Sequence, residues 1–383
     1  MPRFAAIEGV RGWLAWGVVL SHIAQVLGMG LHGGHEVWLD YAGETGVMTF
    51  IAISGFVIAG LVVDKNEPWP RYITRRAFRI FPAYWVAYAA AFLALPLAIA
   101  ALGHTPAALL ADPAYNYDEV LHGWQAAITD RPVEQIGLHI VLLQGVIPDS
   151  LWPYSSTAVL GPAWSLTLEW QFYLIAPVFV WLVARDSSRM AVTLVVAALA
   201  VAFHMGLFGH YDLPSFLPGA GYIFLIGIAS RLNFERLKSA PIGPEIVPVV
   251  IAIGILFPAI MFLAIWLSIL AYLARREAWA AGPSGRRLAG AMDAMFASRV
   301  AQWFGARSYA VYLVHFPIIM GLSLPILRDT HGGTGLQFLA FVAAVIPLTL
   351  LASELMHRLV ERPFIALGAR LARGKPRAAT PAG

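Results

Sequence analysis

The chain has 383 residues, of which 59% are hydrophobic and only 13% are charged, with 26 basic against 22 acidic residues. A soluble domain of this size cannot bury so much apolar surface, so the composition excludes a soluble globular protein and predicts a polytopic membrane protein. The sequence contains no cysteine, which excludes disulfides, thiolate nucleophiles and cysteine-ligated metals.

About 20 consecutive apolar residues suffice to cross a bilayer as a helix, and ten such runs follow one another along the chain. The expected fold is therefore an all-α transmembrane helix bundle. Every even-numbered run is followed by arginine or lysine, which predicts that both termini are cytoplasmic. The shorter apolar stretch 136–147 is expected to lie in the membrane interface or to re-enter. The ten predicted spans are residues 10–29, 45–63, 82–102, 164–184, 190–208, 215–230, 244–257, 258–274, 302–327 and 335–358.

The chain divides into one large domain and a short tail. Residues 1–364 are predicted to form a single transmembrane domain, in which the long outer segment 103–163 exceeds an ordinary connection. The two short runs around Pro258 could instead form one interrupted span. Residues 365–383 combine glycine, proline, alanine and arginine and are predicted to form a disordered, basic cytoplasmic tail.

The first predicted span carries two ionisable residues on one face. Arg11 and His22 are eleven residues apart, which returns a helix to within about 20° of the same face and separates them by roughly 16 Å. Ionisable groups at membrane depth are costly and usually functional, and histidine exchanges protons near neutral pH. A histidine that is merely hydrogen-bonded inside the bundle remains the alternative.

An arginine cluster follows the second predicted span. Arg76 and Arg79 are one helical turn apart and Arg75 is four residues before Arg79, so two or three guanidiniums can converge on one ligand. The planar guanidinium suits phosphate oxygens, and several of them suit a polyphosphate. The alternative is a cytoplasmic anchor that contacts anionic lipid headgroups.

Two further polar clusters lie in later spans. Ser165 and Glu169 are four residues apart where the fourth span begins, so a carboxylate enters the membrane about one turn below a hydroxyl. A capping box would place the acid three residues after the serine, although a simple helix start remains possible. In the ninth span Ser308, Tyr312 and His315 share a stripe, which is also typical of a polar seam between helices.

Seven short motifs thus occur in a fixed order along the chain. They are Glu8-Gly9-Val10-Arg11-Gly12 with His22, Phe50 to Ser54-Gly55-Phe56, Arg76-Ala77-Phe78-Arg79, Trp164-Ser165-Leu166 with Glu169, Phe172-Tyr173, Ser308-Tyr309 through His315, and Glu361-Arg362-Pro363-Phe364.

Together these motifs resemble the acyltransferase-3 family of integral membrane acyltransferases, over nearly the whole chain. Each motif alone is weak, whereas seven in order within a ten-span topology are specific. The chain looks like the minimal form without a fused extracytoplasmic esterase-like domain. It departs from the family pattern at Met48-Thr49 before Phe50 and at Trp170 after Glu169, positions that bear on substrate shape more than on reaction type.

The resemblance implies transfer of an acyl group, commonly acetyl, from cytoplasmic acyl-CoA to a hydroxyl of a carbohydrate or glycoconjugate at the outer face. It implies an enzyme of the bilayer, in the bacterial inner membrane, with no metal and no nucleic-acid partner. Arg75, Arg76 and Arg79 would bind the phosphates of acetyl-CoA. His22 would take the proton of the acceptor hydroxyl as general base, although an acyl-histidine intermediate stays open.

The remaining site residues receive supporting roles under the same resemblance. Arg11 would position a donor phosphate or a neighbouring acid, and Glu169 would position the acceptor or orient an imidazole. The predicted substrate-binding residues are Trp164, Ser165, Tyr312 and His315.

Two other function classes fit the sequence less well. A proton-coupled transporter or a flippase of a lipid-linked sugar could use His22, Glu169 and His315 as a proton relay, but would not require a phosphate-binding arginine cluster. A lipid-binding scaffold would leave the position of His22 unexplained. The pair His32 and His35 has no third ligand at a fixed spacing, so no metal site is predicted there.

Overall fold

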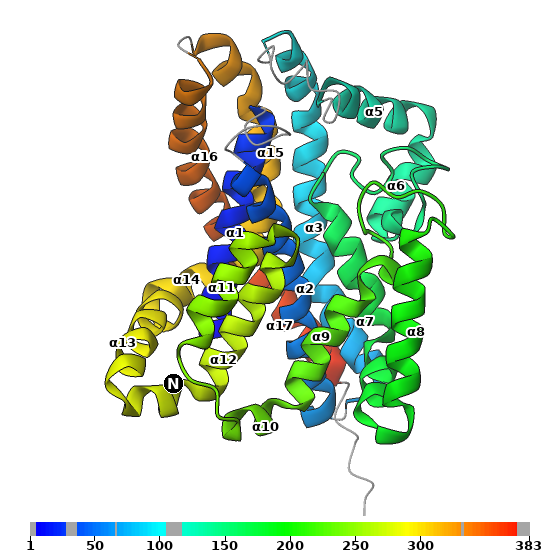
Figure 1. The fold of residues 1–383 in the computed structure, drawn as a ribbon. Helices are drawn as coiled ribbons and strands as arrows, with labels where there is room; N and C mark the ends of the chain where they lie inside the picture. The colour runs from blue at the N-terminus through cyan, green and yellow to red at the C-terminus, as the bar shows by residue number, and fades with distance from the viewer. Residues whose placement is uncertain (1–4, 28–36, 66, 105–116, 331–332, 374–383) are drawn as a thin grey trace, which may run out of the picture.

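The computed structural model describes residues 5–27, 37–65, 67–104, 117–330 and 333–373, and within them every regular element is a helix (Figure 1). The expected all-α class is confirmed. The α-helices are α1 (Ala5–Val26), α2 (Val37–Lys65), α3 (Trp69–Ala101), α5 (Tyr117–Asp130), α6 (Pro132–Ile140), α7 (Ala163–Ala184), α8 (Asp186–His204), α9 (Leu217–Leu232), α10 (Phe234–Ser239), α11 (Ile246–Leu256), α12 (Met261–Ala281), α13 (Pro283–Met292), α14 (Arg299–Ala306), α15 (Ser308–Asp329), α16 (Thr334–Met356) and α17 (Arg362–Arg373).

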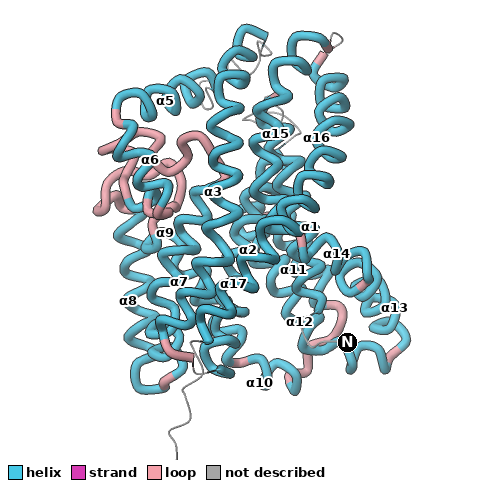
Figure 2. The backbone as a smooth tube through the Cα atoms, turned by 180° about the vertical axis from the view of Figure 1, so that it is seen from behind, coloured by secondary structure: helices cyan, strands magenta, loops and turns pink. Residues whose placement is uncertain are grey.

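The helices form an elongated bundle with two distinct ends. Helices α5 and α6 lie at one end, whereas α10, α13 and the N-terminus lie at the other, and the view from behind in Figure 2 shows the same arrangement. Seven helical stretches within the described residues are long and apolar enough to cross a membrane, so the bundle is an integral membrane structure. They are Ala42–Lys65, Trp69–Ala101, Ala163–Ala184, Asp186–His204, Pro258–Ala281, Ser308–Asp329 and Thr334–Arg373.

The remaining predicted spans are less clear-cut. Helix α1 is not among the seven because its arginine, histidine and glutamine lower its mean hydropathy, and α9 and α11 are shorter apolar helices. The count of ten spans and the cytoplasmic position of both termini therefore stay predictions.

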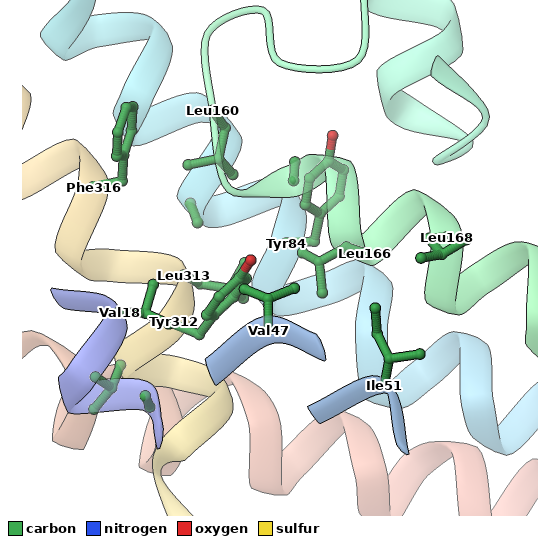
Figure 3. Packing of buried hydrophobic residues seen from close by; sticks show 14 of the residues in the cluster. Val18, Val47, Ile51, Tyr84, Leu160, Leu166, Leu168, Tyr312, Leu313 and Phe316 are labelled. Carbon is green, nitrogen blue, oxygen red and sulfur yellow. The ribbon is translucent and has the colours of Figure 1, made fainter. Parts of the chain in front are cut away.

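The core forms where α1, α2, α3, α7 and α15 meet. Figure 3 shows Val18, Val47, Leu166 and Tyr312, from four of these helices, converging on one another, and all four side chains are buried. Helix α1 approaches its neighbours closely because small residues line it. A Cβ atom on Gly9 would lie only 1.9 Å from the carbonyl oxygen of Phe296, as is typical of helix contacts in membranes.

Three boundaries differ from the sequence prediction. Helix α3 begins at Trp69, so the arginine cluster lies on its first turns rather than in a connection. The predicted ninth span is divided at Arg307 into α14 and α15. Residues 362–373 form α17, which packs on α3 through Phe78 and Phe364, whose ring centroids are 6.5 Å apart. The predicted tail from 365 thus begins with ordered helix, and residues beyond 373 lie outside the described part.

An irregular segment leads from α6 into α7 and sets the position of the α7 N-terminus. Three residues other than glycine, Leu142, Tyr154 and Val159, have positive φ values of 55°, 61° and 70°, a conformation that non-glycine residues rarely adopt. The segment is tied to α7 because the Thr167 hydroxyl donates to the Leu142 carbonyl at 2.8 Å. The stretch 136–147, predicted to lie in the interface or to re-enter, thus comprises the end of α6 and the start of this segment.

His139 on α6 is a buried histidine at the base of this segment. Its Nδ1 lies 3.1 Å from the Tyr84 hydroxyl and its Nε2 lies 3.1 Å from the Ser155 carbonyl oxygen. Burial lowers the pKa of His139 to about 3, because removal from water disfavours the charged ring.

The low pKa of His139 predicts acid sensitivity of the fold. An unfolded histidine binds a proton below about pH 6.5, so the stability that neutral His139 contributes is complete above that pH. It is lost as the pH falls toward 3, by roughly 2–3 kcal/mol between pH 7 and pH 4.5. The Tm of the wild type in detergent should fall further over this interval than the Tm of the His139→Gln variant. Parallel decreases would show that His139 does not titrate on unfolding.

Candidate functional site

A cavity of about 230 Å³ opens between α1, α2, α3, α7 and α15. Apolar side chains of α2, together with Ile80, Leu166 and Phe224, form much of its wall. Its polar lining comes from Glu8, Arg11, Ser54, Arg76, Arg79, Ser165, Glu169, Tyr173, Ser308, Tyr309 and Tyr312.

One end of the cavity carries two arginines that have no direct partner in the described part of the chain. Within the described residues, neither Arg76 nor Arg79 makes a side-chain hydrogen bond or an ion pair within 4.0 Å, and Arg76 Nε is buried without a partner. The Arg76 guanidinium lies 5.8 Å from the ring centroid of Tyr173, a weak cation–π contact. Arg11 from α1 adds a third positive charge, and its Nη1 lies 3.7 Å from Oε1 of Glu8, which makes a loose ion pair. This end is suited to an anion that accepts several hydrogen bonds.

Arg75, the third member of the predicted arginine cluster, lies elsewhere. Its guanidinium pairs with the carboxylate of Glu67, and it does not line the cavity. The structure therefore brings Arg76 and Arg79 together with Arg11 and leaves Arg75 outside, because successive residues on a helix point in directions about 100° apart.

Glu169 faces the cavity and is held from two helices. One of its carboxylate oxygens accepts a hydrogen bond from the Ser54 hydroxyl of α2 at 2.9 Å and a second from the Tyr173 hydroxyl. The sequence pattern did not point to Ser54 and Tyr173 as site residues. Tyr173 could have been found because it follows Glu169 by four residues on the same helix face, whereas no local signal pairs Ser54 with Glu169.

Tyr312 closes the other end of the cavity. Its hydroxyl lies 2.7 Å from the Ser165 hydroxyl and donates to the Pro162 carbonyl at 2.9 Å, both in the region where α7 begins. Trp164, the neighbouring predicted residue, is partly buried and is not part of the lining. On α15 the residue one turn beyond Tyr312 is His315, and the two rings lie 6.0 Å apart.

A pair of histidines lies directly behind Tyr312. His22 Nδ1 is 2.9 Å from His315 Nε2, and His315 Nδ1 is 3.0 Å from the carbonyl oxygen of Val311. His315 is fully buried, while His22 is partly exposed and meets Phe316 edge-on at 5.5 Å. Neither histidine lines the cavity. The structure thus joins two residues that the sequence had placed in separate clusters, 293 positions apart.

No group of three histidine, aspartate or glutamate residues in the described ranges is arranged to hold a metal ion. The pair His32 and His35 lies outside the described residues.

Comparison with known proteins gives one family and several relatives. A family described as an acyltransferase domain matches residues 4–356. A protein of Komagataeibacter xylinus named as a membrane-bound transacylase, BcsY, is 25% identical over 370 residues, which cover 93% of this chain and 81% of the relative. Acyltransferase MdmB of Streptomyces mycarofaciens is 25% identical over 411 residues, covering 99% and 95%. Nodulation protein 10 of Rhizobium leguminosarum bv. viciae is 27% identical over 240 residues, covering 60% of each. No solved structure matches the chain.

Proposed function

Since the chain belongs to the acyltransferase-3 family of membrane acyltransferases, we propose that it moves an acetyl group from cytoplasmic acetyl-CoA to a hydroxyl of a carbohydrate or glycoconjugate. The acceptor is reached at the outer face of the bacterial inner membrane. Two of the relatives carry names for the same reaction class, transacylase and acyltransferase, which supports the acyl transfer but not the choice of acceptor.

The observation that carries this proposal is the arrangement of the cavity. Arg76 and Arg79 lie at one end without a direct partner among the described residues, and Tyr312 at the other end is one helical turn from His315, which contacts His22. Coenzyme A has phosphates for the arginine end and an extended pantetheine arm that can follow the mixed polar and apolar wall of the cavity. The roughly 16 Å between Arg11 and His22 along α1 is a distance that such an arm can span.

Each step of the proposed reaction uses a residue of this arrangement. The acceptor hydroxyl gives its proton to His22 while its oxygen attacks the thioester carbonyl carbon. The carbon–sulfur bond then breaks, and the departing sulfur takes the proton from His22 to leave as the free thiol. Arg11 orients a donor phosphate. Glu169, whose carboxylate is held by Ser54 and Tyr173, positions the acceptor.

The transporter alternative receives less support from the same contacts. A relay through His22, His315 and Glu169 would need a hydrogen-bonded connection between the histidines and the acid. Among the described residues, Glu169 is instead bonded to Ser54 and Tyr173.

The purified protein provides the test of function. With acetyl-CoA labelled in the acetyl group and a panel of glycans, we expect release of free thiol together with base-labile label on a glycan. Movement of a sugar across proteoliposomes without thioester turnover would replace the proposal with the transporter interpretation.

A further inference from the structure

The proton on His315 can be located from its contact with Val311. A carbonyl oxygen only accepts hydrogen bonds, so the 3.0 Å contact with His315 Nδ1 requires the proton to be on that nitrogen. His315 is fully buried, and in the described part of the chain no carboxylate pairs with it. An unpaired buried charge is strongly disfavoured, so the ring is neutral and its Nε2 is a hydrogen-bond acceptor.

The same reasoning then locates the proton on His22. Its Nδ1 lies 2.9 Å from the accepting Nε2 of His315, so Nδ1 of His22 is the donor and carries the proton. The two rings are inclined by only 21°, with centroids 5.1 Å apart. Because the two nitrogens are also close, the rings meet edge to edge. The N–H of His22 therefore lies near the plane of the His315 ring, where the Nε2 lone pair lies. A neutral His22 therefore keeps its Nε2 free of a proton.

We propose that His315 is a positioning residue that holds His22 in the neutral tautomer whose Nε2 can accept a proton. This inference rests on the proposed function, in which His22 is the general base. It also changes the expected role of His315, which the sequence placed among substrate-binding residues, because His315 is fully buried and is not part of the cavity lining.

The pair also stabilises the charge that forms during the reaction. When the acceptor hydroxyl transfers its proton to His22 Nε2, the ring becomes an imidazolium and its Nδ1–H bond to His315 becomes charge-assisted, which strengthens it. His315 keeps its own proton on Nδ1 throughout, bonded to Val311. The base is thus oriented by a third group, as in other base-assisted acyl transfers, but the orienting group here is a neutral imidazole.

Two amide variants separate positioning from packing. In His315→Gln the longer side chain carries its carbonyl oxygen to the region of the original Nε2, where it can accept from His22. In His315→Asn the amide reaches only the region of Nδ1, so it keeps a contact with Val311 and leaves the His22 donor without an acceptor. We expect kcat to fall about 10- to 100-fold in the Asn variant and by less than about 10-fold in the Gln variant. The KM for acetyl-CoA should stay the same in both.

The tautomer itself can be measured without turnover. In protein labelled with ¹⁵N at histidine rings, signals of His22, assigned by their loss in His22→Asn, should show a protonated Nδ1 and a bare Nε2. Equal losses of kcat in the Gln and Asn variants, or a His22 protonated at Nε2, would overturn the proposal. A protein that shows this tautomer but consumes no thioester would instead contradict the proposed function, so the two failures are distinguishable.

Discussion

Replacing His22 with alanine is expected to lower kcat for acyl transfer by about 10²–10⁴-fold, the usual contribution of a general base. The affinity for acetyl-CoA should remain close to that of the wild type, because His22 does not line the cavity that we assign to the donor. Steady-state kinetics and calorimetric binding of acetyl-CoA measure the two quantities separately.

His204 provides a matched control for this variant. It is an exposed histidine on α8 whose Nδ1 contacts only its own helix, at the Ala200 carbonyl. His204→Ala should transfer acetyl groups at the rate of the wild type. If His22→Ala also kept activity within a few-fold of the wild type, the assignment of His22 as the base would be wrong.

The Arg79→Gln variant is expected to show the second large effect, now on donor binding. Hydrogen bonds to charged groups contribute about 1.5–3 kcal/mol, so the affinity for acetyl-CoA should fall roughly 10- to 100-fold. Affinity for S-acetylpantetheine, a thioester without phosphates, should change little, since Arg79 is expected to contact phosphate oxygens. Competition binding with the two donors gives both values.

Two neighbouring arginines sharpen this comparison. Arg71 is exposed on the same helix and is not part of the cavity lining, so Arg71→Gln should bind both donors normally. The sequence predicts that Arg75 binds the donor, whereas in the structure Arg75 pairs with Glu67. Donor binding by Arg75→Gln tests which of the two holds. Equal losses for acetyl-CoA and S-acetylpantetheine in Arg79→Gln would indicate a lipid-anchoring or folding role.

Helix bounds were predicted well from the sequence where a proline or a charged residue ends an apolar run. Helix α7 was predicted at 164–184 and observed at Ala163–Ala184, because Pro162 and Arg185 bound a stretch that is apolar apart from a few polar residues near its start. The start of α3 was missed by thirteen residues, from 82 to Trp69. Its first turns are rich in arginine, so a search for apolar runs excludes them although the helix continues. The division at Arg307 was also missed. Arg307 pairs with Glu354 on α16, and no local pattern reveals that contact.

In the candidate site, too, contacts within one helix could be predicted from the sequence, whereas contacts between helices could not. Helical spacing correctly placed Arg76 beside Arg79, and Ser165 and Glu169 on one face, since such pairs depend only on the helix repeat. It could not predict that Arg75 turns to Glu67 or that Ser54 donates to Glu169. The contact between His22 and His315 depends on how α1 rotates and packs against α15, which the helix repeat of either segment alone does not determine.

Transfer across oriented vesicles tests the central claim most directly. Acetyl-CoA labelled in the acetyl group is supplied only on the side of Arg76 and Arg79, and the glycan acceptor is enclosed on the opposite side. We expect labelled ester on the enclosed glycan with the wild type and none above background with His22→Ala. If labelled ester formed only when both substrates shared one compartment, the result would contradict transfer of the acetyl group from the arginine end of the cavity to an acceptor on the far side of His22.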